Sequence, residues 1–426
     1  MSQEAGQKVE KMSPDAAGDR LAVYLLDEPI GRLWLDERQR FVFQYDRARI
    51  DSSERMALSL SLPLRETPYT DDSSRSFFAN LLPEAEIRKI IARRFGISER
   101  NDFLLLKEIG GECAGAVSVS PEGVAPQEKP GYREIDEDEL HKIVVDLPRK
   151  PLLAGERGIR LSLAGAQDKL PIYMVDDKIF LATGNAPSTH IMKPPIRDLD
   201  GTVTNEAFCM TLAGEMGLSV PESAVRKNID MLFIVRRFDR EKTTDGKWIR
   251  LHQEDFCQAL GVLPDQKYES EGGPSLSRCF NLIARESIRP ATDRMALLKW
   301  VIFNVLIGNA DAHAKNLAVL LTPPGPRLAP FYDLICTKIY ENLSDRLAMK
   351  IGDENRPAWL QPRHWKRFAD DVSIKQSLVL DALSNMAGDV EPISEAAAVQ
   401  FIESYGGDDI VERILEVIRK MARKLT

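Results

Sequence analysis

The chain has 426 residues, of which 43% are hydrophobic and 29% charged, so it can bury a sizeable core and is not a globally disordered protein. Its 57 basic and 65 acidic side chains give a net charge of −8, which argues against a general polyanion-binding protein but not against a local basic patch. No apolar run approaches the roughly 20 residues that span a bilayer. Residues 1–20 lack the apolar segment of a signal peptide, so we expect a soluble, cytoplasmic protein.

The first predicted elements are strands. Residues 21–45 alternate apolar and polar side chains between Asp, Glu and Gly turns, which predicts an antiparallel meander. Helical spacing at 77–91 and 103–106 predicts two helices ahead of a glycine-containing loop at 110–115. The Pro, Gly and Glu content of residues 121–130 is typical of a linker.

Strands and then helices are predicted in the rest of the chain. Strand-like runs occupy residues 170–175, 178–181, 190–193 and 231–235, and a helix is predicted over 205–216 with Gly217 as its C-cap. After residue 255 we predict helices almost throughout, including 293–307, 394–405 and 409–425. Five scattered cysteines without a C-x-x-C pair indicate free thiols in a reducing compartment, not a disulfide framework or a zinc site.

The strongest chemical motif follows the apolar helix at 293–307. Asp311 and Asn316 have the D-x-x-x-x-N spacing of a kinase catalytic loop, in which the Asp accepts the proton of the attacking hydroxyl and the Asn holds Mg²⁺. The same spacing also occurs in polar turns after buried helices. A strand at 317–321 and a turn at 323–326 predict a hairpin that brings Asp333 beside Asn316 as a second Mg²⁺ ligand. The Tyr-Asp-Leu sequence around Asp333 lacks the glycine of a D-F-G motif.

Upstream residues could hold the nucleotide. Residues 162–169 precede a strand and predict either an anion-binding turn or a plain one, because they contain a single glycine. Lys193 ends a strand, as the phosphate-pairing lysine of a kinase does, although a solvated strand end is the more common place for a lysine. Glu206 could hold that lysine or merely favour the helix dipole, and we favour the two roles equally.

The apolar strand that ends at Val235 leads into a predicted hinge at residues 236–239. The backbone of the hinge would meet the adenine edge, and Asp239 could accept a hydrogen bond from a ribose hydroxyl. The alternative is a buried strand with a charged exit. The candidate motifs follow one another in the order of a protein kinase. This order is the phosphate loop, the lysine, the glutamate, the hinge, the catalytic loop and the metal-binding aspartate.

At these motifs the chain resembles the HipA family of bacterial toxin kinases. The resemblance covers residues 21 to about 369 and rests on the segments 78–84, 109–116, 163–169, 188–193, 237–240, 252–255 and 308–316. It implies an α+β, two-lobed protein kinase-like fold with an extra N-terminal α/β module and a helical C-terminal lobe. We therefore divide the chain into a disordered tail (1–20), the N-terminal module (21–125), an ATP-binding α/β region (126–250) and a helical lobe (251–426).

The resemblance also implies cofactors and residue roles. The cofactors would be ATP and Mg²⁺, with Asp311 as catalytic base and Asn316 and Asp333 as metal ligands. The nucleotide site would be formed by Ala164, Gly165, Ala166, Gln167, Lys169, Lys193, Arg236, Phe238, Asp239, Gln253 and His313, together with Asn316 and Asp333. Ser162 stands at the family's autophosphorylation site. Arg236 departs from the family, which often has Glu there, so the adenine contact of this side chain does not carry over.

The implied function is that of a serine/threonine protein kinase acting as the toxin of a toxin–antitoxin pair. Its partners would be a HipB-like helix-turn-helix antitoxin, operator DNA bound through that antitoxin (a nucleoid-associated complex), and a protein substrate such as an aminoacyl-tRNA synthetase. An inactive co-repressor scaffold and a small-molecule phosphotransferase of related fold are the alternatives. The basic residues at 363–367 could contact DNA phosphates, whereas those of the last helix more simply form the solvated side of an amphipathic helix.

Overall fold

The computed structural model describes residues 19–53, 56–124, 130–156, 158–184 and 186–425. Most of the predicted N-terminal tail and the middle of the predicted linker, residues 125–129, lie outside the described residues. The five cysteines are buried free thiols, as expected from their scattered positions. Among the described helices, none combines the length and the apolar character needed to cross a membrane.

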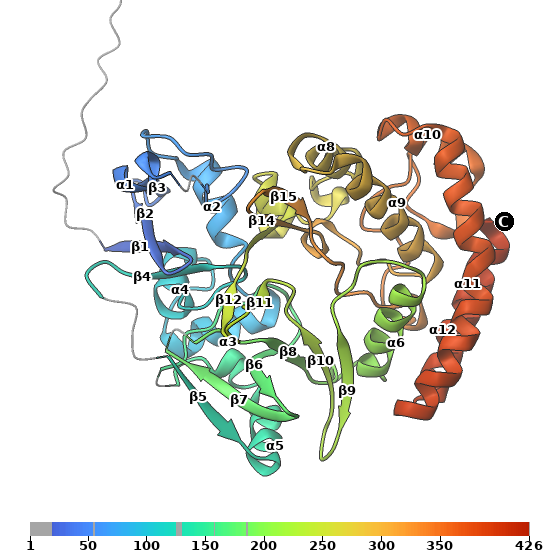
Figure 1. Ribbon diagram of the computed structural model, residues 1–426, viewed down its shortest axis with the longest axis horizontal. Coiled ribbons are helices and arrows are strands. Elements are labelled where there is room, and N and C mark those ends of the chain that lie inside the picture. Colours follow the sequence, from blue (N-terminus) through green and yellow to red (C-terminus); the bar gives the residue numbers. More distant parts are fainter. Residues whose placement is uncertain (1–18, 54–55, 125–129, 157, 185, 426) are drawn as a thin grey trace, which may run out of the picture.

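The N-terminal module is built on a four-stranded antiparallel sheet of order β3-β2-β1-β4 (Figure 1). Its strands are β1 (Arg20–Leu25), β2 (Glu28–Leu35), β3 (Phe41–Tyr45) and β4 (Val117–Pro121), and its helices are α1 (Arg47–Asp51), α2 (Asp71–Ala79), α3 (Ala85–Phe95) and α4 (Asp102–Ile109). The meander is confirmed. The helix predicted at residues 77–91 is divided into α2 and α3, because the chain turns at Pro83, which disfavours a continuous helix. The helix predicted at 103–106 corresponds to α4.

A six-stranded sheet of order β5-β7-β6-β8-β10-β9 lies in the lower part of the molecule as drawn in Figure 1, below the N-terminal sheet. Its strands are β5 (Gly131–Ile135), β6 (Leu170–Val175), β7 (Lys178–Thr183), β8 (His190–Lys193), β9 (Ser223–Lys227) and β10 (Met231–Arg236), accompanied by α5 (Glu137–Asp146), α6 (Thr202–Glu215) and the hairpin β11 (Arg240–Lys242) and β12 (Trp248–Arg250). The four predicted strands are confirmed. Helix α6 begins three residues before the predicted start, and Gly217 adopts a left-handed φ of 75° just beyond its end.

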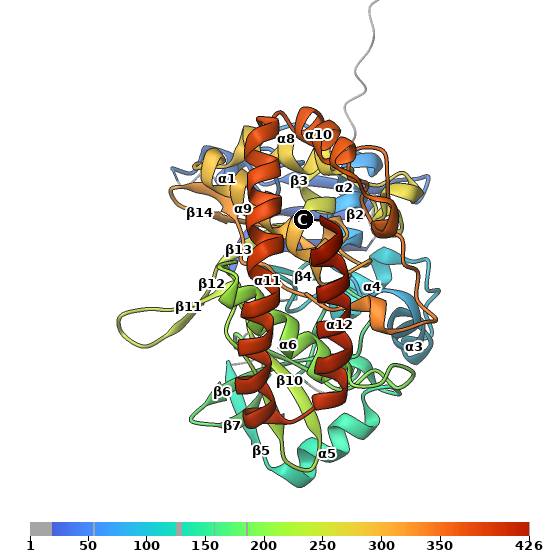
Figure 2. The same cartoon turned by 90° about the vertical axis from the view of Figure 1, so that its right-hand side faces the viewer.

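The C-terminal half is helical except for the sheet β13-β14-β15 and irregular segments around it. Its elements are β13 (His252–Asp255), α7 (Phe256–Ala259), α8 (Leu276–Glu286), α9 (Pro290–Leu306), β14 (Ala318–Thr322), β15 (Gly325–Leu328), α10 (Pro362–Asp371), α11 (Gln376–Tyr405) and α12 (Asp408–Leu425). The β14–β15 hairpin is confirmed. The predicted helix start at residue 394 is wrong, because α11 runs through Pro392 and lies beside α12 along one side of the molecule (Figure 2).

Two large buried clusters hold these parts together. One extends from the N-terminal sheet into one face of the six-stranded sheet, including Met192 and Ile234. The other joins α6, α9 and the last helices to the opposite face, including Phe233 and Val235. Strand β10 therefore contributes alternate side chains to both cores, as expected for a strand buried on its two faces. The predicted boundary near residue 125 lies between the two sheets, but one buried cluster extends across it. The domain boundaries therefore stay predictions.

Candidate active site

The predicted catalytic loop leaves the buried helix α9 at Gly308 and is held by side-chain hydrogen bonds. Asn309 Oδ1 accepts a hydrogen bond from the backbone N–H of Asp311 (3.0 Å), and Asn309 Nδ2 donates to Asn304 Oδ1 of α9 (2.7 Å). Asn316 Nδ2 donates to the Asp311 carbonyl (2.9 Å). The Asp311 side chain is 50% exposed, so its backbone is fixed while its carboxylate faces solvent.

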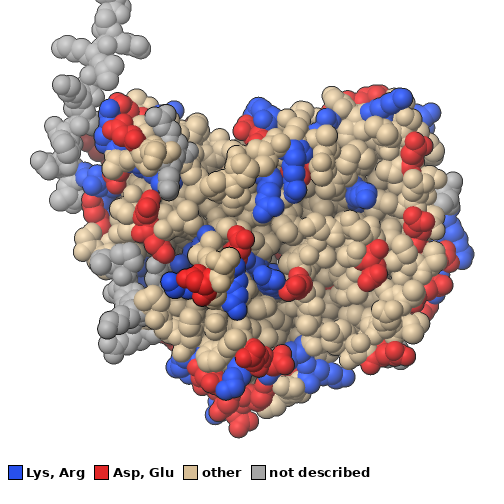
Figure 3. Space-filling view, in the orientation of Figure 1, with Lys and Arg blue, Asp and Glu red and all other residues tan. Residues whose placement is uncertain are grey.

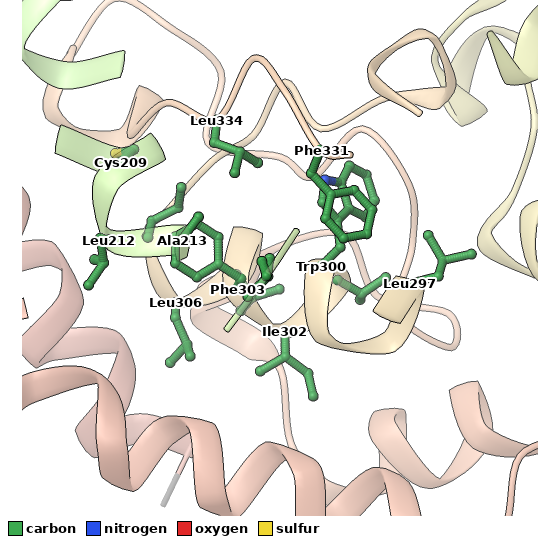
Figure 4. Close-up of a cluster of buried hydrophobic side chains, with 14 of the residues drawn as sticks. Cys209, Leu212, Ala213, Leu297, Trp300, Ile302, Phe303, Leu306, Phe331 and Leu334 are labelled. Atoms are coloured by element: carbon green, nitrogen blue, oxygen red, sulfur yellow. The ribbon is translucent and has the colours of Figure 1, made fainter. Parts of the chain in front are cut away.

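Asp333 follows the β14–β15 hairpin on a short segment anchored in the core. Phe331 is stacked on Trp300 of α9, with ring centroids 6.1 Å apart, and Leu334 is buried on the other side of Asp333 (Figure 4). Asp333 itself has a φ of 54°, in the left-handed region that non-glycine residues rarely adopt. Its carboxylate contacts Lys193 and is 38% exposed. Burial opposes its charge, but Lys193 and Lys169 hold the pKa of Asp333 below its ordinary value.

Lys193 and Glu206 form a buried ion pair. Lys193 ends β8 and its Nζ donates to Glu206 Oε1 over 2.6 Å. Burial disfavours the charge of Lys193, yet Asp333 and Glu206 raise its pKa above the ordinary value. Burial raises the pKa of Glu206 to about 7, although Lys193 opposes the shift. Glu206 lies in the second turn of α6, so of its two predicted roles the ion pair is the one observed.

The loop at residues 162–169 folds back on its own lysine. Lys169 Nζ donates to the Ala164 carbonyl (2.7 Å), and a Cβ at Gly165, whose φ is 107°, would lie 2.5 Å from that ammonium. Burial lowers the pKa of Lys169. Ser162 is fully buried and donates from Oγ to the Leu81 carbonyl (2.7 Å). Gln167 makes only a long contact with the Pro194 carbonyl (3.5 Å), and Ala166 is exposed at the tip.

Two further predicted residues carry buried polar atoms without a hydrogen-bond partner among the described residues. These atoms are Oε1 of Gln253, on β13, and Nδ1 of His313, in the catalytic loop. Burial lowers the pKa of His313. Because buried polar atoms are rarely left unpaired, these two are suited to a polar ligand. Asn316 donates from its amide nitrogen, which leaves its amide oxygen for a cation, and Asp333 adds a carboxylate. This donor set fits Mg²⁺ and a nucleotide.

The hinge prediction needs a correction at Asp239. This side chain is 4% exposed, and both carboxylate oxygens accept hydrogen bonds from Arg237, at 2.8 and 2.9 Å. The backbone N–H of Gly115 also donates to it over 2.7 Å. The carboxylate is therefore committed to tying the glycine loop to the hinge, and we withdraw it as a ribose ligand.

Arg236 and Phe238, the other hinge residues predicted to contact the nucleotide, are accessible to a ligand. Arg236 pairs with Glu222 (3.1 Å), and Phe238 is stacked on Tyr332 with ring centroids 5.5 Å apart. Both line a pocket of about 320 Å³ that Pro330 of the Asp333 segment also lines. Lys169, Lys193 and Asp333 are not among its lining residues, so the pocket does not include the residues predicted to hold the phosphates.

A buried network that no sequence pattern predicts braces the predicted catalytic loop from the N-terminal module. Lys315 Nζ donates to Asn80 Oδ1 (2.6 Å) and Asp255 Oδ2 (2.8 Å) and lies 3.7 Å from Glu84 Oε1. The N–H of Glu84 donates to the Gly165 carbonyl (3.1 Å). All of these residues lie in or beside the family motifs, but no spacing rule pairs residues so far apart in the chain.

The fold is protein kinase-like, with an added N-terminal module. It has two lobes, a lysine on the sheet paired with a glutamate on the next helix, and a polar loop after a buried helix. Two family models match the chain, the HipA N-terminal domain over residues 21–120 and the HipA-like C-terminal domain over residues 161–393. The chain belongs to the HipA family.

Individual relatives match most of the chain. Y4mE of Sinorhizobium fredii is 42% identical over 87% of this chain and 89% of its own. The serine/threonine-protein kinase toxin HipA of Shewanella oneidensis is 32% identical over 86% of each chain. A solved chain in the complex of Shewanella oneidensis HipA, HipB and operator DNA superposes with a TM-score of 0.83 at 29% identity, covering 95% of this chain and 97% of that one.

Proposed function

We propose that the protein is a serine/threonine protein kinase that transfers the γ-phosphoryl group of ATP to a protein hydroxyl. The observation that carries the proposal is the meeting of Lys193, Glu206 and Asp333, because these residues come from β8, α6 and the segment after β15. A lysine held by a glutamate and placed beside the metal aspartate is the nucleotide-handling arrangement of protein kinases.

In this proposal each side chain has one task. Asn316 and Asp333 would hold Mg²⁺, which neutralises charge on the transferring phosphoryl group when it is bound. Lys193 and Lys169 would pair with phosphate oxygens, and Gln253 and His313 would offer their buried polar atoms to the nucleotide. Asp311, half exposed on a fixed backbone, would accept the proton of the acceptor hydroxyl.

Transfer of radiolabel from [γ-³²P]ATP tests this proposal. The acceptors are the chain itself and casein, with Mg²⁺ or with EDTA. We expect label only with Mg²⁺. Absence of label on both acceptors would favour the inactive scaffold, and label on small hydroxyl compounds alone would favour the small-molecule phosphotransferase.

We further propose that the protein is the toxin of a toxin–antitoxin pair and joins a HipB-like antitoxin on operator DNA. The solved relative was determined in a complex of HipA, HipB and operator DNA. The substrate would be a translation component such as an aminoacyl-tRNA synthetase. Phosphoproteomics after pulsed expression, compared with an Asp311→Asn variant, would identify it, and an unchanged phosphoproteome would contradict a protein substrate.

The exposed basic side chains of α10 are the proposed phosphate contacts. Arg363, Lys366 and Arg367 are exposed, and among the described residues only Arg367 of these three has an acidic partner within salt-bridge distance, Asp353 at 2.8 Å. Acidic and basic side chains are interspersed over the face drawn in Figure 3. In this proposal, base readout would come from the antitoxin. Neutralising these three side chains should weaken the salt dependence of operator binding. The slope of log K against log salt concentration should fall in magnitude by about one unit per lost contact, and the choice of operator should not change.

The last helix serves as the control for that experiment. Ile414 and Ile418 of α12 are fully buried, and Arg419 pairs with Glu412 (2.7 Å) and Glu395 (3.2 Å). Its basic residues therefore form the solvated side of an amphipathic helix, and Arg419→Gln should leave the salt slope unchanged. An unchanged slope in the triple variant of α10 would contradict the proposed phosphate contacts.

A further inference from the structure

A tyrosine from outside the catalytic loop contacts the predicted catalytic base. Tyr268 lies between two short 3₁₀ turns, η2 (Pro264–Gln266) and η3 (Glu269–Glu271), in the connection from α7 to α8. Its hydroxyl hydrogen-bonds to Asp311 Oδ1. Its ring meets the edge of the His313 ring, with centroids 5.1 Å apart. The two side chains that flank the catalytic base on this side thus support each other.

The hydroxyl is the donor in this hydrogen bond. Burial and the negative charge of Asp311 raise the pKa of Tyr268 above its ordinary value, so the phenol keeps its proton. The carboxylate of Asp311 accepts that proton's hydrogen bond on Oδ1, and His313 Nε2 lies 3.9 Å from the same oxygen. The structure gives Oδ2 no hydrogen-bond partner among the described residues.

The backbone that carries Tyr268 is anchored on both sides. Lys267 Nζ donates to Glu84 Oε2 over 2.7 Å, which ties this segment to the N-terminal module and the network around Lys315. On the other side, the N–H of Glu269 donates to the Ala348 carbonyl (3.1 Å), and Glu269 Oε2 accepts from the N–H of Lys350 (2.6 Å). A side chain held in this way has little freedom to swing away, so its hydroxyl marks a fixed point beside Asp311.

We propose that Tyr268 is a positioning residue that fixes the Asp311 carboxylate through Oδ1 and leaves Oδ2 for the acceptor hydroxyl. The inference rests on the proposed function, because it assigns Tyr268 a part in phosphoryl transfer. It differs from a blocking role, in which the phenol would occupy the place of the acceptor. The half-exposed Asp311 carboxylate favours positioning, since a blocking side chain would cover the base.

The test compares Tyr268→Phe with Tyr132→Phe. Both substitutions remove one hydroxyl and keep the ring, and Tyr132, whose hydroxyl donates to the Pro187 carbonyl (3.1 Å), lies on the edge strand β5 outside the proposed machinery. The rate constant of label transfer from [γ-³²P]ATP to the chain is measured against ATP concentration at saturating Mg²⁺. We expect Tyr268→Phe to lower the maximal rate constant about 10-fold with an unchanged half-saturating ATP concentration. Tyr132→Phe should change neither value.

A double substitution separates positioning from a general structural role. If Tyr268 acts through Asp311, adding Tyr268→Phe to Asp311→Asn should cause no further loss in single-turnover transfer. A further loss of similar size, an unchanged rate in the single variant, or a faster rate that reveals blocking would each overturn the inference. Failure of the wild-type protein to transfer label would instead overturn the proposed function.

Discussion

The ammonium of Lys193 lies 2.6 Å from Glu206 Oε1 and also contacts Asp333, so one cation joins α6 to the segment that follows the β14–β15 hairpin. The lysine is buried and its charge is matched by two carboxylates. This arrangement makes the site sensitive to the position of α6 as well as to the identity of its own residues.

Glu206→Gln should lower the rate of phosphoryl transfer by about 10- to 100-fold, because Lys193 would be left to Asp333 alone and drawn away from phosphate oxygens. The measurement is label transfer at saturating ATP. Glu215→Gln, an exposed site at the end of the same helix, is the control and should have no effect. A fully active Glu206→Gln protein would contradict the role of the pair.

Asp333→Asn should weaken ATP binding about 10-fold in Mg²⁺ and have little effect in EDTA, because the amide loses the charge that holds the metal. Asn is the suitable replacement since it tolerates the φ of 54° at this position better than Ala. Titration of ATP binding against Mg²⁺ gives the answer. An identical Mg²⁺ dependence in the two proteins would remove Asp333 from the metal site.

Phosphorylation of Ser162 should switch the kinase off. The Ser162 hydroxyl is buried against the Leu81 carbonyl, so a phosphate of about −2 charge could not stay in place and would force residues 162–169 out of the site. Intact-mass analysis and label transfer on separated forms should find the phosphorylated form inactive, and Ser162→Ala should be active and unmodified. A phosphorylated form that retains full activity would rule out the switch.

Glu254 should make stability pH-dependent. It is buried on β13, accepts from the N–H of Leu60 (2.9 Å) and bonds to Ser59, and burial raises its pKa to about 8 from an ordinary 4.5. Between about pH 4.5 and 8 the carboxyl keeps its proton in the folded protein, whereas the unfolded chain has already lost it. The free energy of unfolding therefore falls as the pH rises through this range.

The measurement is the Tm difference between wild type and Glu254→Gln across that range. Wild type should lose stability relative to the variant as the pH rises, by at most about 1.4 kcal/mol per pH unit. The exposed Glu403→Gln should show a constant difference. A constant difference for Glu254→Gln as well would mean that the carboxyl is ionised in the folded protein.

Local patterns predicted most of the strands and helices. Alternation predicted β8, a continuous apolar run predicted β10, and the D-x-x-x-x-N spacing pointed to the polar loop between α9 and β14. These features depend on neighbours in the sequence, which a single chain displays. The Lys193–Glu206 pair was within reach because a strand and the next helix are adjacent in space.

Long-range partners were out of reach. Asn80 and Lys315 are bonded across 235 residues, and Tyr268 meets Asp311 across 43, with no periodicity to link either pair. The role of Asp239 was misjudged for the same reason, since its partners include the distant backbone of Gly115. The Pro392 case is different, because packing of α11 against α12 and α9 outweighs the local preference of proline to end a helix.

The most direct test of the account is label transfer by Asp311→Asn beside wild type and Asp265→Asn, an exposed aspartate in the connection from α7 to α8. We predict that Asp311→Asn loses transfer by at least about 100-fold while its Tm and ATP affinity stay close to wild type, because the carboxylate acts on the acceptor hydroxyl. Asp265→Asn should transfer normally. Near-normal transfer by Asp311→Asn would contradict the assignment of the catalytic base and, with it, the kinase mechanism proposed for this chain.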